Sequence, residues 1–190
     1  MSQSENNVNR INISKNIIQK YLPMNPIIID CGAHIGIDTI ELAKISGSKI
    51  YAFEPVDVIF KQLVSNTKNF PNITCFNIAL NHFDGEAEIY VSSGDSDGSS
   101  SLLKPKKHIV DHPKVLFNEV EKVKCKKLDS WAKENNVKKV DMLWLDMQGA
   151  EQKMLMVSNE ILNSVSVIHT EVSVRETYEG VEDYYLYKKF

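Results

Sequence analysis

At 190 residues, with 43% hydrophobic and 25% charged content, the chain is long enough for one globular domain with a sizeable core. We expect this domain over residues 26–190, after an N-terminal extension or helix over residues 1–25. The formal net charge of −3 gives no global positive field, so neither nucleic acid nor an anionic membrane is an expected partner. No apolar run reaches the roughly 18 residues of a membrane span, and the 3 scattered cysteines suit reduced thiols better than disulfides or a metal cluster, which predicts a cytoplasmic protein.

The first predicted element is a strand that stops at an acid and turns through two glycines into a helix. The apolar run 27–29 predicts a buried strand, and apolar residues at helical spacing over 37–43 predict the helix. Between them, Gly32 allows a tight turn and Gly36 allows the helix to pack close to the strand. The carboxylate of Asp30 is placed to meet a cationic or hydroxyl-bearing ligand. Such a loop is typical of nucleotide-cofactor binding.

Strand and helix signals then continue along the chain. The pattern predicts a buried strand over 49–53, a helix over 56–68, a third strand over 72–79, a turn over 81–85 and an alternating strand over 87–91. Residues 92–101 are almost all Ser, Gly and Asp, which predicts a mobile loop and by composition favours a solvated connection; the Ser-Ser-Leu motif of the resemblance described below implies a lid instead, which we favour. A basic run follows, and surface solvation is its simplest interpretation, although it could hold an anionic acceptor: Lys104, Lys106, Lys107 and His108.

The second half adds further elements of both kinds. They are an exposed strand over 120–125, a short helix opening at 128–131, a buried strand over 140–146, a helix over 149–158 and a strand over 164–172. Alternation of this kind favours an α/β fold: a Rossmann-like, doubly wound and mostly parallel sheet with helices on both faces. Ligands bind beyond the carboxyl ends of such strands, where four acids are expected: Asp30, Glu54, Asp146 and Glu171. Any one of them could instead cap a helix or lie in a solvated loop.

The loop also discriminates between cofactors. A dinucleotide fold normally shows G-x-G-x-x-G, whose middle glycine lets the pyrophosphate approach the backbone, and His34 occupies that position here. A side chain there crowds a diphosphate but not a ligand without phosphates, which argues for S-adenosylmethionine over NAD. Glu54 is placed to accept both ribose hydroxyls of any adenosine ligand.

An ordered set of short motifs resembles the FkbM-type methyltransferases from about Ile27 to Val172. The motifs are Asp30–Gly36, Ala52–Pro55, Asn77–Leu80, Ser100–Leu102, Leu128–Trp131 and Asp146–Glu151. The resemblance implies a Rossmann-like methyltransferase that uses S-adenosylmethionine, and it adds Ala79 and Asp146 to the expected cofactor contacts. Two residues depart from the family pattern. His34 replaces the usual asparagine and alters the hydrogen bonds offered to the cofactor, and Gln148 replaces the usual glutamate and removes one carboxylate from the reaction pocket.

Methyl transfer from a sulfonium requires alignment of the acceptor, and a sugar hydroxyl also requires removal of its proton. Asp146 is the first choice for the reaction centre, since it follows a buried run, with helix capping as its alternative role. Glu151 could orient substrate or simply favour the helix dipole. His34 could donate to the cofactor carboxylate or cap the backbone. His169 could be a base or a satisfied interior histidine, and Glu171 has the same two alternatives, a base or a satisfied interior side chain.

No metal site is assigned, because the remaining histidines show no ligand spacing: His82, His108 and His112. Sheets of this methyltransferase type usually end in an antiparallel hairpin, whereas only residues 175–190 follow the last predicted strand, and residues 184–190 read as the start of a helix. We therefore expect a fold without the complete C-terminal hairpin, in a chain shortened at its C-terminus or with a sheet edge covered by a partner subunit, as in a homo-oligomer.

The leading hypothesis is an S-adenosylmethionine-dependent methyltransferase that acts on a hydroxyl of a glycan or a related small molecule. A non-catalytic cofactor-binding or interaction module is the second hypothesis, because Gln148 replaces an acid. An NAD-dependent oxidoreductase is the third, disfavoured by His34.

Overall fold

The computed structural model describes residues 18–172 and 176–181. Most of the predicted N-terminal extension, and the helix expected to start near the C-terminus, lie outside these described residues. The predictions of an incomplete hairpin and a shortened chain therefore stay predictions. Within the described ranges, no helix is long and apolar enough to cross a membrane.

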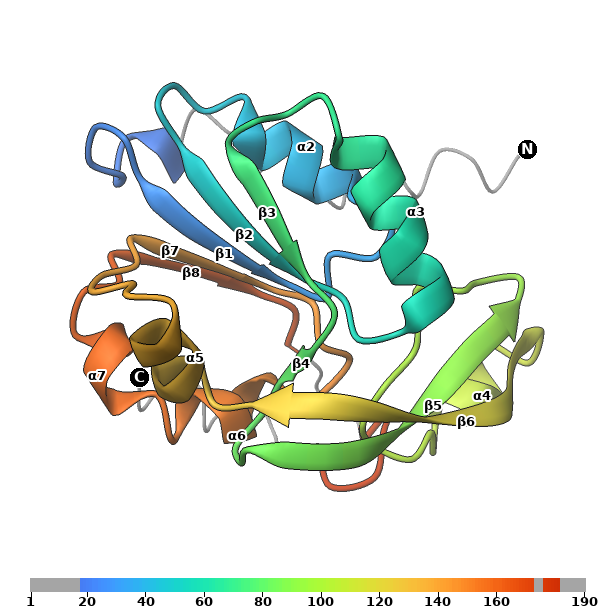
Figure 1. Ribbon diagram of the computed structural model, residues 1–190. Helices are drawn as coiled ribbons and strands as arrows, with labels where there is room; N and C mark the ends of the chain where they lie inside the picture. The colour runs from blue at the N-terminus through green and yellow to red at the C-terminus, as the bar shows by residue number, and fades with distance from the viewer. Residues whose placement is uncertain (1–17, 173–175, 182–190) are drawn as a thin grey trace.

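A parallel sheet forms the centre of the molecule (Figure 1). Its strands are, in sheet order, β3 (Ile73–Phe76), β2 (Lys49–Phe53), β1 (Ile27–Cys31), β7 (Met142–Leu145) and β8 (Val167–Thr170). Every pairing in this sheet is parallel, and Ile28 of β1 lies opposite Ile50 on one side and Met142 on the other. The predicted α/β class with a mostly parallel, doubly wound sheet is confirmed.

Helices cover both faces of the sheet (Figure 1). The helices α2 (Ile37–Ala43) and α3 (Asp57–Thr67) lie on one face, and α5 (Leu128–Glu134), α6 (Glu151–Leu155) and α7 (Asn159–Leu162) lie on the other. Parallel strands are buried on both faces in such an arrangement, which explains why they read as continuous apolar runs in the sequence.

Successive side chains of each strand point to opposite faces and so enter different cores. One set of strand side chains points towards α2 and packs with Leu42: Ile28, Ile50 and Met142. The other set points towards α5 and α6 and packs with Trp131 and Met154: Ile29, Tyr51, Phe53 and Leu143. The Trp131 ring lies edge-on to Phe53, with 4.9 Å between ring centroids, and this aromatic packing supports the carboxyl end of β2.

A smaller sheet lies beside the carboxyl ends of the central strands (Figure 1). Its strands are, in sheet order, β4 (Ala79–Leu80), β6 (Val115–Lys126) and β5 (Gly85–Gly94). The predicted third strand over 72–79 is therefore wrong at its end, because Ala79 pairs with β6 and not with the central sheet. Asn77 causes this departure: its side-chain amide donates to the carbonyls of Glu54 and Pro55 at 3.0 and 3.1 Å, which turns the chain away.

Further details of the elements differ from the predictions. The strand predicted over 87–91 extends to Gly94, so the serine-rich loop is shorter than predicted. The predicted helix over 149–158 ends as α6 at Leu155, and α7 starts separately because the Asp129 carboxylate accepts bonds from the backbone N–H groups of Glu160 and Ile161, each at 3.0 Å. The basic run contains a short helix, α4 (His108–Asp111), in which His108 is buried and not solvated.

Candidate active site

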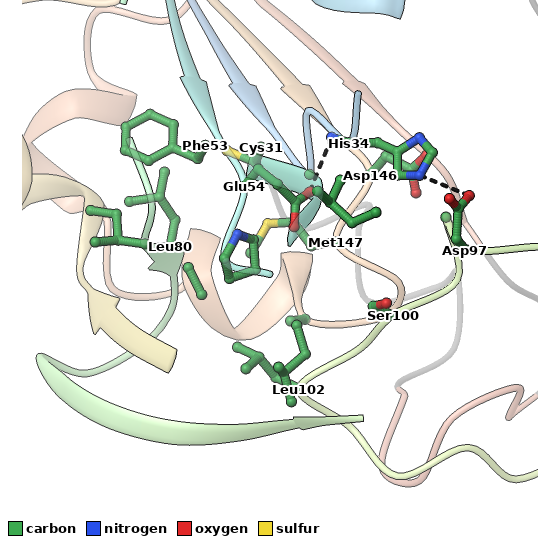
Figure 2. A pocket seen from close by; sticks show the side chains of 18 residues that line it. Cys31, His34, Phe53, Glu54, Leu80, Asp97, Ser100, Leu102, Asp146 and Met147 are labelled. Atoms are coloured by element: carbon green, nitrogen blue, oxygen red, sulfur yellow. Dashed lines mark hydrogen bonds and ion pairs between the residues drawn. The ribbon is translucent and has the colours of Figure 1, made fainter. Parts of the chain in front are cut away.

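The candidate site lies where the strand order reverses in the centre of the sheet. β1 is flanked by β2 and β7, and ligands of doubly wound folds bind outside the carboxyl ends of the strands at such a point. A pocket that is partly open to solvent lies there between the central sheet and the smaller sheet. Its lining comes from the loops after β1, β2 and β7, from β4 and from the loop after β5, and it includes Gly32 and Ala79. Figure 2 shows further lining residues: His34, Glu54, Leu80, Asp97, Ser100, Asp146 and Met147.

Gly32 brings the β1 loop and the β7 loop into direct contact. Its backbone has φ +83°, and a methyl group there would lie 1.9 Å from the carbonyl oxygen of Asp146. Gly36 has φ +91° and allows a different approach, since a methyl group there would lie 2.8 Å from Leu63 Cδ1 of α3. The close approach predicted at Gly36 thus involves α3 and not the strand, while the tight turn predicted at Gly32 forms one wall of the pocket.

Glu54 follows β2 and is held by the backbone of two loops. Its Oε1 accepts a hydrogen bond from the Val56 N–H at 2.8 Å, and its Oε2 accepts one from the His34 N–H at 3.1 Å. The side chain is 6% exposed, and burial raises the pKa of Glu54 to about 7 despite these two bonds. A carboxylate has about four acceptor positions, so Glu54 keeps free positions that face the pocket.

His34 connects the β1 loop to the serine-rich segment after β5. The residue has φ +49°, its N–H binds Glu54, and its Nε2 lies 3.0 Å from Oδ1 of Asp97 (Figure 2). We call residues 95–101 the serine loop. This loop supplies Asp97 and Ser100 to the pocket lining, as a lid would, while its mobility stays a prediction.

Asp146 follows β7 on the opposite side of the pocket. Its Oδ1 accepts a hydrogen bond from Nε2 of Gln148 at 2.6 Å. Burial and the negative charge of Glu171 raise the pKa of Asp146 to about 7, because both disfavour the ionised form. A carboxyl with such a pKa, lining a pocket, can take up and release a proton near neutral pH.

Comparison with known proteins identifies the family. The model of the methyltransferase FkbM domain matches residues 30–187, which is most of the chain. The chain belongs to the FkbM methyltransferase domain family. It is therefore a methyltransferase with S-adenosylmethionine as methyl donor, as the motif order implied.

Individual relatives agree with the family match of this FkbM methyltransferase. The chain is 27% identical over 176 residues to the 2-O-methyltransferase NoeI of Sinorhizobium fredii, covering 90% of this chain and 72% of that protein. It is 26% identical over 165 residues to the AMB antimetabolite synthetase AmbE of Pseudomonas aeruginosa, covering 71% of this chain but 8% of that protein.

Solved structures with similarity to the chain include an rRNA methylase from Streptococcus thermophilus, at 15% identity and TM-score 0.46, covering 82% of this chain and 64% of that one. Another is a TehB-like SAM-dependent methyltransferase from Corynebacterium glutamicum, at 19% identity and TM-score 0.29, covering 39% and 40%. The chain thus spans less than two thirds of each of these two solved chains.

The pocket of this FkbM methyltransferase fits an adenosyl ligand. Apolar side chains form one part of its wall, including Phe53, Ile78 and Leu80, and suit a purine ring. The free acceptor positions of Glu54 suit ribose hydroxyls, and the lack of a side chain at Gly32 leaves room against the backbone. Among the described residues, no group of three His, Cys, Asp or Glu side chains is arranged to hold a metal ion.

Three predicted site residues of the FkbM domain point to protein groups and do not line the pocket. Asp30 is 1% exposed, accepts a hydrogen bond from the Thr39 hydroxyl at 2.5 Å, and has a pKa raised to about 7 by burial. Glu151 is 2% exposed at the start of α6 and accepts a hydrogen bond from the Met147 N–H at 2.7 Å. The His169 ring stacks on Trp144, with 3.7 Å between centroids, and burial lowers its pKa.

Two residues in or beside the site were not predicted individually: Asp97 in the pocket lining, and Tyr178, which binds Gln148. Asp97 carried no signal beyond the loop composition, whereas Ser100 was part of a family motif. Tyr178 carried none, although it is 2% exposed and its hydroxyl donates to the Ser99 carbonyl at 2.8 Å. Its position depends on the path of the chain after β8, which periodicity alone does not define.

Proposed function

We propose that this FkbM methyltransferase transfers a methyl group to a hydroxyl oxygen of a sugar or a related small molecule. The name of the relative 2-O-methyltransferase NoeI, aligned with 90% of the chain, supports oxygen as the acceptor atom. The formal net charge of −3 and the acids around the pocket favour a neutral or cationic acceptor over a polyanion such as nucleic acid.

The cofactor half of the site comprises the loops after β1 and β2. Glu54 would accept the ribose hydroxyls, and Ala79 would border the base together with the apolar wall. His34 would hold Asp97 of the serine loop across the mouth of the pocket. Asp30 and Gly36 would act indirectly, because one supports the loop through Thr39 and the other allows α3 to pack against it.

Asp146 is the proposed general base. When bound, S-adenosylmethionine supplies an electrophilic methyl group on a sulfonium sulfur, which takes the electron pair of the broken carbon–sulfur bond and leaves as a neutral thioether. Asp146 would accept the proton of the acceptor hydroxyl as the new carbon–oxygen bond forms. The observation that carries this proposal is the position of Asp146 in the pocket lining with a pKa raised to about 7.

The test compares Asp146→Asn with the native chain. We expect methyl transfer from S-adenosylmethionine to a panel of sugar acceptors to fall by about 10²–10⁴-fold, the usual contribution of a general base. Binding of S-adenosylhomocysteine, measured by calorimetry, should remain, because the adenosine contacts lie across the pocket. Asp57→Asn is the matched control, since Asp57 is an exposed acid that pairs with Lys61 on α3.

Two results would overturn the proposal. Transfer by Asp146→Asn at the native rate would exclude this carboxylate as the base. Binding of S-adenosylhomocysteine by the native chain without transfer to any hydroxyl of the panel would favour the non-catalytic module.

A further inference from the structure

The side chain of Gln148 joins the reaction pocket to the serine loop. Its Nε2 donates to Oδ1 of Asp146 at 2.6 Å, and its Oε1 accepts from the hydroxyl of Tyr178 at 3.0 Å. The same hydroxyl lies 2.8 Å from the carbonyl oxygen of Ser99 in the serine loop. A chain of hydrogen bonds therefore runs from Asp146 through Gln148 and Tyr178 to the loop.

The two middle members of this chain are held in place. Gln148 has φ +53°, and its carbonyl oxygen accepts a hydrogen bond from the Ser101 hydroxyl at 2.8 Å. Tyr178 is 2% exposed, and its ring packs against His108 with 5.2 Å between centroids. Since neither backbone position nor ring is free to move, the adjustable parts are the side-chain amide of Gln148 and the hydroxyl proton of Tyr178.

Counting the hydrogen-bond donors shows that this series of hydrogen bonds has two states. A tyrosine hydroxyl has one proton, and in the arrangement above it meets two acceptors, Gln148 Oε1 and the Ser99 carbonyl, so only one of them is fully satisfied. If Asp146 carries a proton, a half-turn of the amide lets Asp146 donate to Oε1 and lets Nε2 donate to the Tyr178 oxygen. The Tyr178 proton is then free for the Ser99 carbonyl, and every member is satisfied.

We propose that Gln148 is a positioning residue that couples the protonation of Asp146 to the hold of Tyr178 on the serine loop. The loop is held more tightly when Asp146 is protonated and less tightly when it is ionised. The bearing of this coupling on methyl transfer rests on the proposed role of Asp146 as base. In that role Asp146 gains its proton during transfer, so the loop stays closed until the proton leaves.

The charged groups that face Asp146 favour proton uptake near neutral pH. Among the described residues, those that act on the Asp146 carboxyl are acids from four parts of the chain: Asp30 of β1, Asp38 of α2, Glu151 of α6 and Glu171 after β8. Together with burial they place the pKa of Asp146 at about 7, so both states of the chain are accessible between pH 6 and 8, the range about one unit on either side.

Glutamine is required for this coupling, which gives meaning to its departure from the family motif. A glutamate at position 148 could not donate to an ionised Asp146 and could join it only by sharing a proton. Gln148→Glu therefore restores the usual family residue while replacing a two-way amide with a second acid. We expect the pair to keep one shared proton to a higher pH than Asp146 alone.

The experiment measures hydrogen exchange of the backbone amides over 95–103 in the full chain from pH 5.5 to 8.5, corrected for the intrinsic pH dependence of exchange. In the native chain, protection of this segment should fall about threefold to tenfold as the pH rises through about 7, which is the net value of one hydrogen bond. In Gln148→Met and Tyr178→Phe the fall should disappear. In Asp146→Asn, whose amide can donate to Oε1 at every pH, protection should stay high.

The outcomes separate this inference from the proposed function. A pH-dependent fall that persists unchanged in both Gln148→Met and Tyr178→Phe, with peptides of β1 equally protected in all chains, overturns the coupling. Loss of the fall near pH 7 in Gln148→Glu supports it, because a carboxylate has no amide to turn, and a fall with the native midpoint in that variant contradicts it. Because exchange requires no acceptor, the coupling can hold even where Asp146→Asn transfers methyl groups at the native rate, which would remove only the proposed base.

Discussion

The two sides of the pocket hold their carboxylates by different means. On the β2 side, both oxygens of Glu54 are bound by backbone N–H groups, from Val56 and His34. On the β7 side, Asp146 is bound by the side chain of Gln148. Backbone donors fix a carboxylate and favour its ionised form, whereas a side-chain amide can turn. The difference assigns the fixed side to binding of the adenosine and the adjustable side to chemistry that moves a proton.

The largest effect is expected where the two sides of the pocket touch, at Gly32 of the β1 loop against the Asp146 carbonyl of the β7 loop. In Gly32→Ala the added methyl group would lie 1.9 Å from the Asp146 carbonyl oxygen, a backbone atom that cannot give way by itself, and the backbone has φ +83°. Backbone strain and the clash together should lower the free energy of unfolding by about 3–5 kcal/mol. Urea unfolding measures this change, and binding of S-adenosylhomocysteine should be lost with it.

Gly36→Ala is the matched control for that variant. Its φ of +91° imposes similar strain, but the added methyl group meets Leu63 Cδ1, the end of a flexible side chain, at 2.8 Å. We expect a loss of about 1–3 kcal/mol. Equal losses in the two variants would mean that strain dominates and that contact between the two sides contributes little.

The fixed side was largely predictable from the sequence, and the adjustable side was not. Gly32 and Glu54 lie where a strand–turn–helix pattern puts them, because their roles follow from local backbone geometry and from the end of a strand. The same rule placed Asp30 at the pocket edge of β1. Asp30 lies one residue before Cys31, the last residue of β1, so its side chain points to the face of the sheet that α2 covers, where the Thr39 hydroxyl donates to it.

On the adjustable side, the partners are far apart in the sequence. Gln148 contacts Tyr178, 30 residues later, and on the fixed side His34 likewise contacts Asp97, 63 residues later. Periodicity reports which face of an element is buried but not which loops meet. The role of Glu151 stays a prediction for a related reason, since a buried acid in a first helical turn can serve either a ligand or the backbone, and here its carboxylate accepts a hydrogen bond from the Met147 N–H.

The second prediction concerns the charge on the fixed side. The pKa of Glu54 rises from an ordinary 4.5 to about 7 in the fold, so the folded chain binds more protons than the unfolded chain between these values. The stability that Glu54 contributes is therefore complete below pH 4.5 and is lost as the pH rises to about 7. Relative to Glu54→Gln, which does not titrate, the native chain should lose up to about 3 kcal/mol from pH 4.5 to pH 8.

Ligand binding should show the opposite preference at this residue. Glu54→Gln loses a charged acceptor for the ribose hydroxyls, and its amide nitrogen cannot accept from one of the two backbone N–H groups, so its affinity for S-adenosylhomocysteine should fall about 10–100-fold. Urea unfolding at the two pH values and calorimetry at pH 8 measure the two effects. Unchanged affinity would remove Glu54 from the cofactor site, and unchanged relative stability would show that its carboxyl is not desolvated.

The smallest effect is expected at Glu151 on the adjustable side. A variant there distinguishes a catalytic role of this carboxylate from a role in holding the β7 loop. Its carboxylate accepts a hydrogen bond from the Met147 N–H and lies outside the pocket lining, so it holds the β7 loop in place. Glu151→Gln keeps an acceptor oxygen at the same place, and the free energy of unfolding should fall by only about 0.5–1 kcal/mol. Methyl transfer per folded molecule should stay within about twofold of the native value, a difference of less than 0.5 kcal/mol in the barrier. A general base replaced by an amide would instead lose about 10²–10⁴-fold, so a loss of that size in Glu151→Gln would transfer the proposed role from Asp146 to Glu151.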